Sequence, residues 1–325
     1  MTSVPTPALA PRLPRALADR LVVPVIAAPM LRVSGRELVE AACRSGVIGA
    51  FPTANARTAA GLDRWLSALD ERVSRADDAP YCPNLIIRQP DLQGHLDVLV
   101  RHQVEVVITS VGSPAAAVQP LHDVGCLVLS DVASLAHAQK AVGAGADGLV
   151  LLAAGAGGQT GWLNPFAFVR AVREFFDGPV VLAGGISDGH ALAAAEVLGC
   201  DLGYVGTPFI ATTESLADPA YRDMVVASSM DDVLCTSAFT GLPANMLRPS
   251  IVSAGLDPAA LDEAVTPDDA TRLYGGPDGV GPRRWTDVYS AGHSVSGVRA
   301  AGPVTDLVAR FVEEYRATRG GGRGT

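Results

Sequence analysis

The feature that most constrains the fold of this 325-residue chain is a strand-and-helix unit that recurs about every 22 residues. Short β-branched runs begin at Val104, Cys126 and Asp147, which are 22 and 21 residues apart. Two more begin at Val180 and Leu202, again 22 residues apart. A strand of about five residues, a helix of about ten and two short loops need roughly that length. Because the apolar runs are continuous rather than alternating, they are typical of parallel strands buried on both faces.

Eight such strands can be read along the chain. They are Pro24–Ala28, Val47–Ala50, Asn84–Ile87, Val104–Thr109, Cys126–Ser130, Asp147–Leu151, Val180–Ala183 and Leu202–Val205. The predicted helices are Gly35–Arg44, Ala56–Ala76, Leu92–His102, Pro114–Asp123, Leu135–Val142, Pro165–Phe176, Asp188–Leu198 and Val304–Thr318. Asp188 is a good N-cap for the seventh of these helices. Eight units favour an α/β fold of the (β/α)8 TIM-barrel type. An open doubly wound sheet is the competing architecture.

The spacing of the predicted strands and helices also predicts the domain organisation of the chain. Residues 1–20 form an N-terminal extension, and residues 21–212 together with 287–318 form the barrel. Residues 213–286 contain many Pro, Gly and Asp residues and break the rhythm. We expect this stretch to be a helical and loop excursion between strand 8 and helix 8, which acts as a lid or substrate subdomain. Residues 319–325 read as a flexible tail.

Charge and cysteine content exclude several classes of protein. The chain has 25 Lys+Arg against 34 Asp+Glu and a single lysine, Lys140, so neither a nucleic-acid surface nor a polybasic membrane patch is expected. No apolar run approaches the roughly 20 residues of a membrane span, and no signal peptide is apparent. The five cysteines are scattered without metal-ligand spacing, and HExxH and EF-hand patterns are absent. We therefore expect reduced thiols, no metal and a cytoplasmic location.

Two glycine-containing loops follow the seventh and eighth predicted strands. They are Ala183-Gly184-Gly185-Ile186 and Val205-Gly206-Thr207-Pro208. In TIM barrels these two loops commonly hold a phosphate, because glycine lets the backbone approach closely and free N–H groups bind the anion. The sequence therefore predicts a phosphate site here, with tight turns as the alternative reading. GxGxxG after the first strand and GxxxxGK[ST] are both absent.

The loop after the sixth strand, residues 153–161, contains four glycines in nine positions. Glycine loses the most conformational entropy on ordering, so packing alone does not explain this content. A close approach of the backbone to a flat ligand is the better interpretation, and a plain linker is the alternative.

Together these segments resemble the nitronate monooxygenase family, formerly called 2-nitropropane dioxygenase. The resemblance rests on Ile26-Ala27-Ala28-Pro29-Met30, Gly155-Ala156-Gly157-Gly158-Gln159-Thr160-Gly161, Ala183-Gly184-Gly185-Ile186 and Gly206-Thr207-Pro208-Phe209. Ala238-Phe239-Thr240-Gly241-Leu242-Pro243-Ala244 and Ser290-Ala291-Gly292-His293-Ser294 resemble later segments of the family. The similarity spans about residues 22–315. Flavin-dependent enoyl reductases share most of these motifs.

The resemblance implies a TIM barrel that binds FMN non-covalently across its mouth and oxidises alkyl nitronates with O2 to a carbonyl compound and nitrite. The partners would be this small-molecule substrate and O2, and a homo-oligomer is possible. By position, the flavin-binding residues would be Ala28, Pro29, Met30, Asn84, Asp131, Gly157, Gly158, Gly184, Gly185, Gly206 and Thr207. Phe51, Trp162 and the excursion are expected to supply pocket walls.

The chain departs from the family pattern at two positions. Many members carry a histidine base in the strand-six loop, where this chain has Gln159, and an amide cannot accept a proton near neutral pH. Many carry a flavin-contacting lysine at the end of strand five, where this chain has Asp131. His293 lies in the Gly292-His293-Ser294 segment and could exchange roles with Gln159, so both are candidate catalytic residues. The other five histidines lie in predicted helices and read as solvated.

These departures leave three functions open. The first is nitronate oxidation, which needs no proton abstraction when the substrate is already an anion. The second is an FMN-dependent NAD(P)H reductase of the enoyl-reductase type, and the third is a flavin-binding protein with lost or altered turnover. A barrel that holds a phosphorylated substrate without flavin is disfavoured, since the only lysine, Lys140, lies in a predicted helix.

Overall fold

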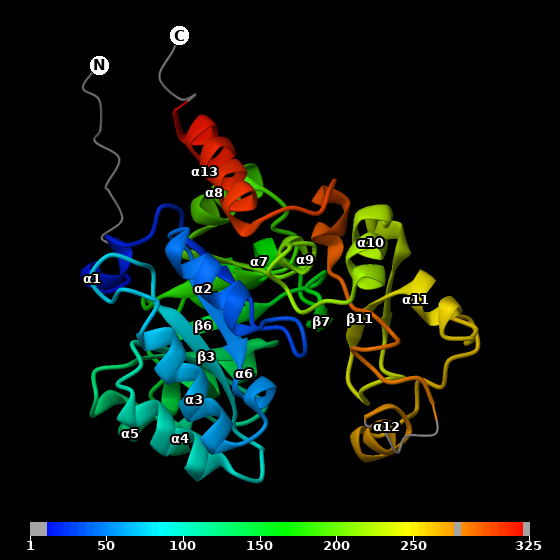
Figure 1. Ribbon diagram of the computed structural model, residues 1–325, viewed down its shortest axis with the longest axis horizontal. Coiled ribbons are helices and arrows are strands. Elements are labelled where there is room, and N and C mark those ends of the chain that lie inside the picture. Colours follow the sequence, from blue (N-terminus) through cyan, green and yellow to red (C-terminus); the bar gives the residue numbers. More distant parts are fainter. Residues whose placement is uncertain (1–11, 276–280, 321–325) are drawn as a thin grey trace.

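The computed structural model describes residues 12–275 and 281–320, and its eight barrel strands close into a ring (Figure 1). The order around the ring is β1-β2-β3-β4-β5-β6-β8-β9, with every neighbouring pair parallel. The strands are β1 (Val25–Ala27), β2 (Ile48–Pro52), β3 (Tyr81–Ile86), β4 (Val106–Ser110), β5 (Leu127–Val132), β6 (Gly148–Leu152), β8 (Val180–Ala183) and β9 (Leu202–Val205). The TIM-barrel prediction is confirmed, and the open sheet is excluded.

Eight helices cover the outside of the barrel (Figure 1). They are α2 (Arg36–Arg44), α3 (Ala59–Asp70), α4 (Leu92–Arg101), α5 (Ala115–His122), α6 (Leu135–Gly143), α7 (Pro165–Arg173), α8 (Gly189–Leu198) and α13 (Val304–Gly320). The side chain of Asp188 accepts the N–H of Ala191 and so caps α8, as predicted. The predicted helix Ala56–Ala76 is shorter in the structure, because Thr58 caps a helix that begins only at Ala59.

Side chains alternate along each strand between the inside of the barrel and the helical layer. In β5, Leu127 and Leu129 belong to the inner cluster, whereas Val128 and Val132 pack outward against helices. The inner cluster also contains Ile26, Ile48, Cys82, Ile108, Val150, Val181 and Leu202. Because successive strand residues point to opposite faces, the last inward residue of each strand faces the mouth of the barrel.

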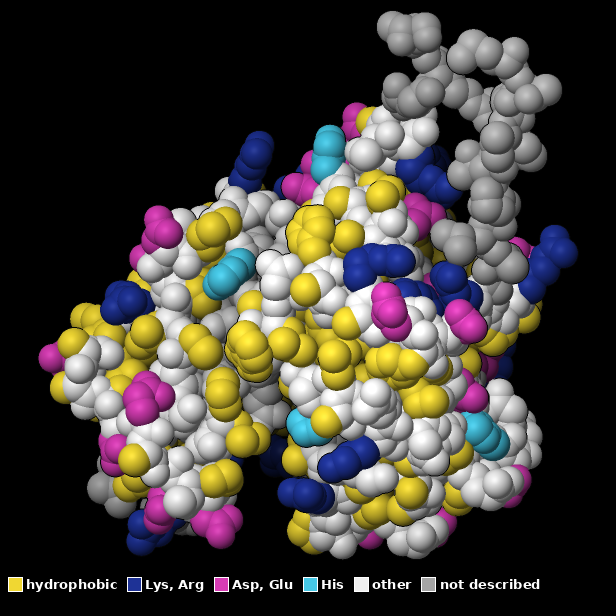
Figure 2. All heavy atoms as spheres, turned by 180° about the vertical axis from the view of Figure 1, so that it is seen from behind, with side chains coloured by type: hydrophobic (Ala, Val, Ile, Leu, Met, Phe, Trp, Pro, Cys, Tyr) yellow, Lys and Arg dark blue, Asp and Glu magenta, His cyan; other side chains and the backbone are white. Residues whose placement is uncertain are grey.

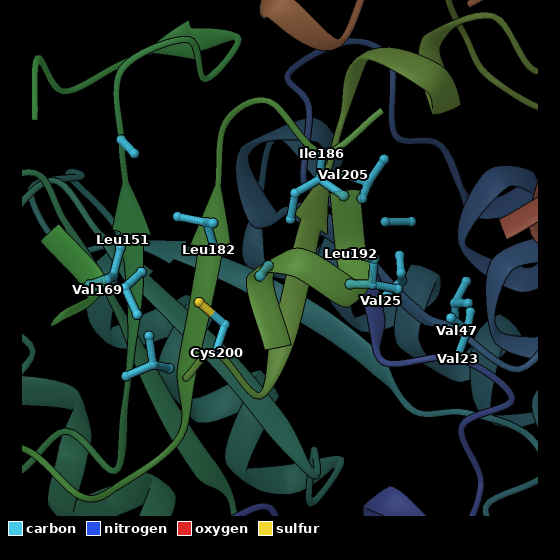
Figure 3. Packing of buried hydrophobic residues seen from close by; sticks show 14 of the residues in the cluster. Val23, Val25, Val47, Leu151, Val169, Leu182, Ile186, Leu192, Cys200 and Val205 are labelled. Carbon is cyan, nitrogen blue, oxygen red and sulfur yellow. The ribbon is translucent and has the colours of Figure 1, made fainter. Parts of the chain in front are cut away.

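Two hydrophobic layers hold the barrel together. The outer layer packs strands against helices, as Val169 of α7 does beside Leu151 and Leu182 (Figure 3). The inner layer fills the barrel and is closed from below by Leu13 and Leu17, around the short helix α1 (Arg15–Ala18). The first part of the expected N-terminal extension, residues 1–11, lies outside the described residues, as do residues 321–325 of the expected tail.

The excursion between β9 and α13 forms a smaller lobe beside the barrel mouth (Figure 1). It contains α9 (Thr207–Ile210), α10 (Pro219–Ala227), β10 (Val233–Thr236), β11 (Ala244–Leu247), α11 (Arg248–Ser253) and α12 (Pro267–Tyr274), followed by a 3-10 turn at His293–Gly297. The excursion was expected to be helix and loop only, and the structure corrects this. β10 and β11 form a small antiparallel sheet with β7 (Gly158–Gln159), a two-residue strand within the glycine loop.

The chain segment that returns to the barrel, residues 287–303, packs largely with the excursion. Val288 lies in the apolar cluster of Phe239 and Met246, and Ala291 and Val295 lie in that of α10. These contacts place residues 288–295 against the excursion. No helix in the described ranges combines the length and the apolar character that crossing a membrane requires.

Candidate active site

A cavity of about 490 Å³ opens at the carboxyl ends of the barrel strands, between the barrel and the excursion. From behind, the molecule shows a deep hollow between these two parts (Figure 2). Its floor consists of the last inward-facing residues of successive strands: Pro52, Asn84, Ser110, Asp131, Leu152, Ala183 and Tyr204. This is the end of a TIM barrel at which active sites are built.

Twelve of the thirteen residues predicted for the site line this cavity. They are Ala28, Pro29, Met30, Asn84, Asp131, Gly157, Gly158, Gln159, Gly184, Gly185, Gly206 and Thr207. The exception is His293, which is exposed to solvent and rests against Gly155. In the described residues no histidine lines the cavity.

The loops after β8 and β9 present free backbone donors. Among the described residues, the N–H groups of residues 184–187, 206 and 207 have no backbone or side-chain acceptor. The ten-residue helix α8 follows directly, with its N-terminal dipole at this end. Unpaired N–H groups at adjacent loops make a site for a phosphate or another anion.

Backbone geometry requires glycine at two of the three glycine positions in these loops. Gly184 has φ +113° and Gly185 has φ +77°, a region that L side chains rarely adopt. A Cβ at Gly184 would also approach the amide nitrogen of Ala156 to 3.0 Å. Gly206 has φ −106°, and a Cβ there would meet only Ala28 and Met30 at 3.6 Å. Gly206 therefore tolerates a side chain. Gly184 lacks the space for one, and the positive φ of both Gly184 and Gly185 would strain it.

The glycine loop after β6 is held against the return segment of the excursion. The N–H of Gly158 donates to Ser290 Oγ at 2.6 Å, and the N–H of His293 donates to the carbonyl of Gly155 at 2.9 Å. A Cβ on Gly157 would approach the nitrogen of Gly292 to 2.8 Å. The glycines thus permit a close approach of two backbones as well as lining the cavity.

The segment after β1 is held by side-chain hydrogen bonds, and Asn55 Nδ2 donates one of them to the carbonyl of Met30 at 3.1 Å. Ser34 Oγ accepts the N–H of Met30 at 3.0 Å and donates to the carbonyl of Ala28 at 3.2 Å. Ala28, Pro29 and Met30 are thereby held as one wall of the cavity. No side-chain donor or acceptor is needed from these residues, so any contact with a ligand is made by backbone and apolar atoms.

Three polar side chains face the cavity, and β3, β4 and β5 each supply one of them. Ser110 Oγ donates to Asn84 Oδ1 at 3.0 Å, which orients the amide of Asn84. Asp131 lies beside them, and its Oδ1 is buried without a hydrogen-bond partner. Burial raises the pKa of Asp131 to about 7, and the side chain of Asn84 opposes this shift. Asn84 was expected to open its strand, but β3 begins at Tyr81, so Asn84 lies in its second half.

Two candidate pocket walls lie elsewhere, and this part of the expectation was wrong. Phe51 is fully buried on the outer face of β2, where its ring meets Trp65 at 5.6 Å between centroids. Its position in the strand alternation points it away from the mouth. Trp162 is 83% exposed and does not line the cavity.

The excursion supplies lining residues that sequence reasoning did not assign to the site. Arg284 is the one cation that lines the cavity in the described part of the chain. Its Nη1 donates to the carbonyl of Phe239 and its Nη2 to Thr271 Oγ1, at 3.1 and 3.2 Å. Burial lowers the pKa of Arg284, and the nearby Arg32 lowers it further. No motif marks Arg284, since only tertiary packing brings it to the mouth.

Five histidines were expected to be solvated helix residues, and His95 departs from this. His95 is 3% exposed, and burial lowers its pKa.

A group of possible metal ligands at the start of α8 has a structural explanation. Asp188, His190 and Glu314 place ligand-type atoms within 4.8 Å of one another. However, Asp188 accepts the N–H of Ala191, and Glu314 accepts that of Gly189, so the carboxylates cap α8.

Comparison with known proteins agrees with this architecture. The family profile "Nitronate monooxygenase" matches residues 91–314. A nitronate monooxygenase of Paraburkholderia phytofirmans is 28% identical over 287 residues, covering 75% of this chain and 78% of that protein. The solved structure of a nitroalkane oxidase from Streptomyces ansochromogenes superimposes with a TM-score of 0.77 at 26% identity, covering 94% of this chain and 99% of that one.

A dehydrogenase is also among the relatives. The "(3aS,4S,5R,7aS)-5-hydroxy-7a-methyl-1-oxo-octahydro-1H-indene-4-carboxyl-CoA dehydrogenase" of Mycobacterium tuberculosis is 27% identical over 232 residues. The match covers 70% of this chain but only 64% of the dehydrogenase. Since the family profile spans more than half of the chain and agrees with the barrel and its glycine loops, the protein belongs to the nitronate monooxygenase family of flavin-dependent oxidoreductases.

Proposed function

We propose that this protein binds FMN at the barrel mouth and oxidises alkyl nitronates with O2 to a carbonyl compound and nitrite. The observation that supports the cofactor is the set of free backbone N–H groups in the two neighbouring loops, at residues 184–187 and 206–207. Together they fit one phosphate. A second phosphate cradle or an adenosine fingerprint is not apparent in the chain, which favours FMN over FAD.

The chain's own residues have separable parts in this proposal. The loops after β8 and β9 hold the phosphate, while Ala28, Pro29, Met30, Gly157 and Gly158 form the walls around the ring system. When bound, the flavin supplies the electron transfer between substrate and O2. Arg284 can pair with the negative charge of a nitronate, because it faces the cavity with no carboxylate partner among the described residues.

Neither of the two residues predicted to act in catalysis places a base in the cavity. Gln159 faces the cavity from β7, and its amide can orient a substrate but cannot accept a proton near neutral pH. His293, the other candidate base, lies outside the lining. We therefore expect anionic nitronates to be turned over faster than neutral nitroalkanes by about 10²–10⁴-fold, the usual contribution of a general base.

This expectation is tested by comparing kcat/KM for a nitroalkane and its nitronate in wild type, Gln159→His and His293→Ala. Gln159→His should raise the activity on the neutral substrate, and His293→Ala should change neither substrate. Loss of neutral-substrate activity in His293→Ala would show that His293 is the base. If no variant oxidises either form, nitronates are not the substrate.

The cofactor is tested by the absorption spectrum and by chromatography of the compound released on heating. Flavin absorption with release of FMN supports the proposal, and release of FAD contradicts the one-phosphate site. A purified protein that neither carries nor takes up flavin would contradict the whole assignment.

A second candidate function is a flavin-dependent reductase or dehydrogenase that uses NAD(P)H. It is favoured by the similarity to the Mycobacterium tuberculosis dehydrogenase. Anaerobic addition of NADH or NADPH separates the two functions, because rapid bleaching of the flavin indicates a reductase. A flavin that neither NAD(P)H nor nitronates reduce would leave a flavin-binding protein with lost turnover.

A further inference from the structure

Asp131 is the one acidic residue that lines the cavity in the described part of the chain, and the function proposed above gives it no task. It continues the inward row of Leu127 and Leu129 in β5, so its carboxyl lies on the cavity floor. Its Oδ1 is buried and has no hydrogen-bond partner. A buried polar atom without a partner destabilises the protein unless a ligand or water satisfies it.

Among residues 12–275 and 281–320, the groups that face Asp131 are all uncharged. Asn84 and Cys82 face it from β3, and Tyr204 faces it from β9. Ser110, on the intervening strand β4, donates to Asn84. Burial raises the pKa values of Cys82 and Tyr204 well above their usual range, so both stay neutral up to pH 8 and beyond. Arg284, which is the one cation that the described residues bring to the cavity, projects from the excursion and is bonded to Phe239 and Thr271.

The surroundings therefore favour the neutral carboxylic acid. Burial raises the pKa of Asp131 to about 7 in the empty cavity, and only Asn84 opposes this shift. A flavin that fills the cavity removes further water from the carboxyl group. Its phosphate, in the loops after β8 and β9, adds a second negative charge to the same cavity. Both effects disfavour the carboxylate still more.

We propose that Asp131 is a proton-linked binding residue, which stays protonated beneath the bound flavin and donates a hydrogen bond to it. The inference rests on the proposed function, because it requires a flavin at the barrel mouth. Above neutral pH the free protein carries the Asp131 carboxylate. Binding of flavin then takes up one proton, which forms the O–H bond of the neutral acid in the complex. No other covalent bond forms or breaks.

Linkage fixes the direction of the pH dependence. Below pH 7 Asp131 is already protonated, so binding takes up no proton at this residue. Well above pH 7 each further pH unit lowers the fraction of the binding-competent acid by a factor that approaches ten, and the flavin dissociation constant rises by the same factor. The second ionisation of a phosphate monoester lies near pH 6 and affects wild type and variants alike.

The experiment measures FMN binding to flavin-free protein by calorimetry at pH 5.5 and 8, in buffers of different ionisation enthalpy. At pH 8 the wild type should take up close to one proton more than Asp131→Asn, and at pH 5.5 the two should agree. Asp97→Asn is the matched control, since Asp97 lies on the exposed face of α4. It should behave as the wild type.

Equal proton uptake by wild type and Asp131→Asn at pH 8 overturns the inference and leaves the proposed function standing. A wild type that binds no FMN at either pH overturns both. If Asp131→Asn binds too weakly for calorimetry, the wild type alone decides. A dissociation constant that rises about tenfold per unit between pH 7.5 and 8.5 supports the inference, and a flat profile overturns it.

Discussion

Gly206 lies at the carboxyl end of β9, where its backbone borders the cavity and leaves its N–H free. An aspartate at this position should fit sterically, because a Cβ meets only Ala28 and Met30 at 3.6 Å. Gly185 is a less suitable position for the same test, since its φ of +77° adds backbone strain to any substitution.

We predict that Gly206→Asp loses flavin because its carboxylate lies near the phosphate. Two unit charges about 4 Å apart repel by about 4 kcal/mol at an effective dielectric of 20, which corresponds to roughly 10³-fold in affinity. Gly206→Asn has the same size without the charge and is the matched control. Flavin titration of both folded variants checks the prediction, and equal affinities would show that the phosphate lies elsewhere.

Arg284 is the cavity residue whose charge can be tested by substitution. Arg284→Ala should raise the KM for a nitronate about 10–100-fold, because a hydrogen bond to a charged group contributes about 1.5–3 kcal/mol. Flavin content should not change, since Arg284 belongs to the excursion and not to the phosphate loops. Arg272→Ala removes an exposed guanidinium that pairs with Asp269, and it serves as the control. An unchanged KM in Arg284→Ala would assign substrate binding to other residues.

Helix α8 illustrates how an element is secured at the end that faces the site. Its first turn has two carboxylate caps, Asp188 Oδ1 on the N–H of Ala191 at 2.8 Å and Glu314 Oε2 on that of Gly189 at 3.0 Å. The second cap comes from α13, so it links the seventh barrel helix to the last one. These caps lie next to the phosphate loop and help to hold it in place.

We predict that Asp188→Ala lowers the free energy of unfolding by about 0.5–2 kcal/mol, which is the usual effect of losing an N-cap. Asp188→Asn keeps an acceptor oxygen and should lose much less. Urea denaturation of the two variants measures the difference. A loss of equal size in both would mean that the charge of Asp188, and not its hydrogen bond, stabilises the helix.

Ser290 joins the barrel to the excursion and so connects the two parts of the molecule. Its Oγ accepts the N–H of Gly158 at 2.6 Å and donates to the carbonyl of Asn245 at 2.7 Å. Its carbonyl accepts the hydroxyl of Tyr221, whose ring stacks on Tyr289 at 4.3 Å. One buried residue therefore holds the glycine loop, β11 and α10 together.

Ser290→Ala should destabilise the protein by about 1–3 kcal/mol, because it leaves a buried N–H and a buried carbonyl without partners. It should also weaken flavin binding, since the loop that it releases lines the cavity. Thermal unfolding and flavin titration measure the two effects. Ser67→Ala, on the exposed face of α3, is the control. Unchanged flavin affinity in Ser290→Ala would show that the loop is held without this link.

The barrel and most of the cavity could be predicted from sequence, because both depend on local patterns. A strand that is buried on both faces needs a continuous apolar run, and this signal located all eight strands to within a few residues. The glycines at 184, 185 and 206 mark tight turns at strand ends, and in a barrel all such ends meet on one side. Residues next to those ends therefore had to lie together.

Tertiary structure alone decided which other side chains reach the cavity. Phe51 and Asp131 both lie near the ends of strands, but strand alternation turns the first toward α3 and the second toward the mouth. Arg284 enters the site through the fold of the excursion, and His293 stays outside it for the same reason. Contacts between segments more than a hundred residues apart, such as Gly158 with Ser290, leave no periodic pattern in the sequence, because their geometry depends on how the excursion packs against the barrel.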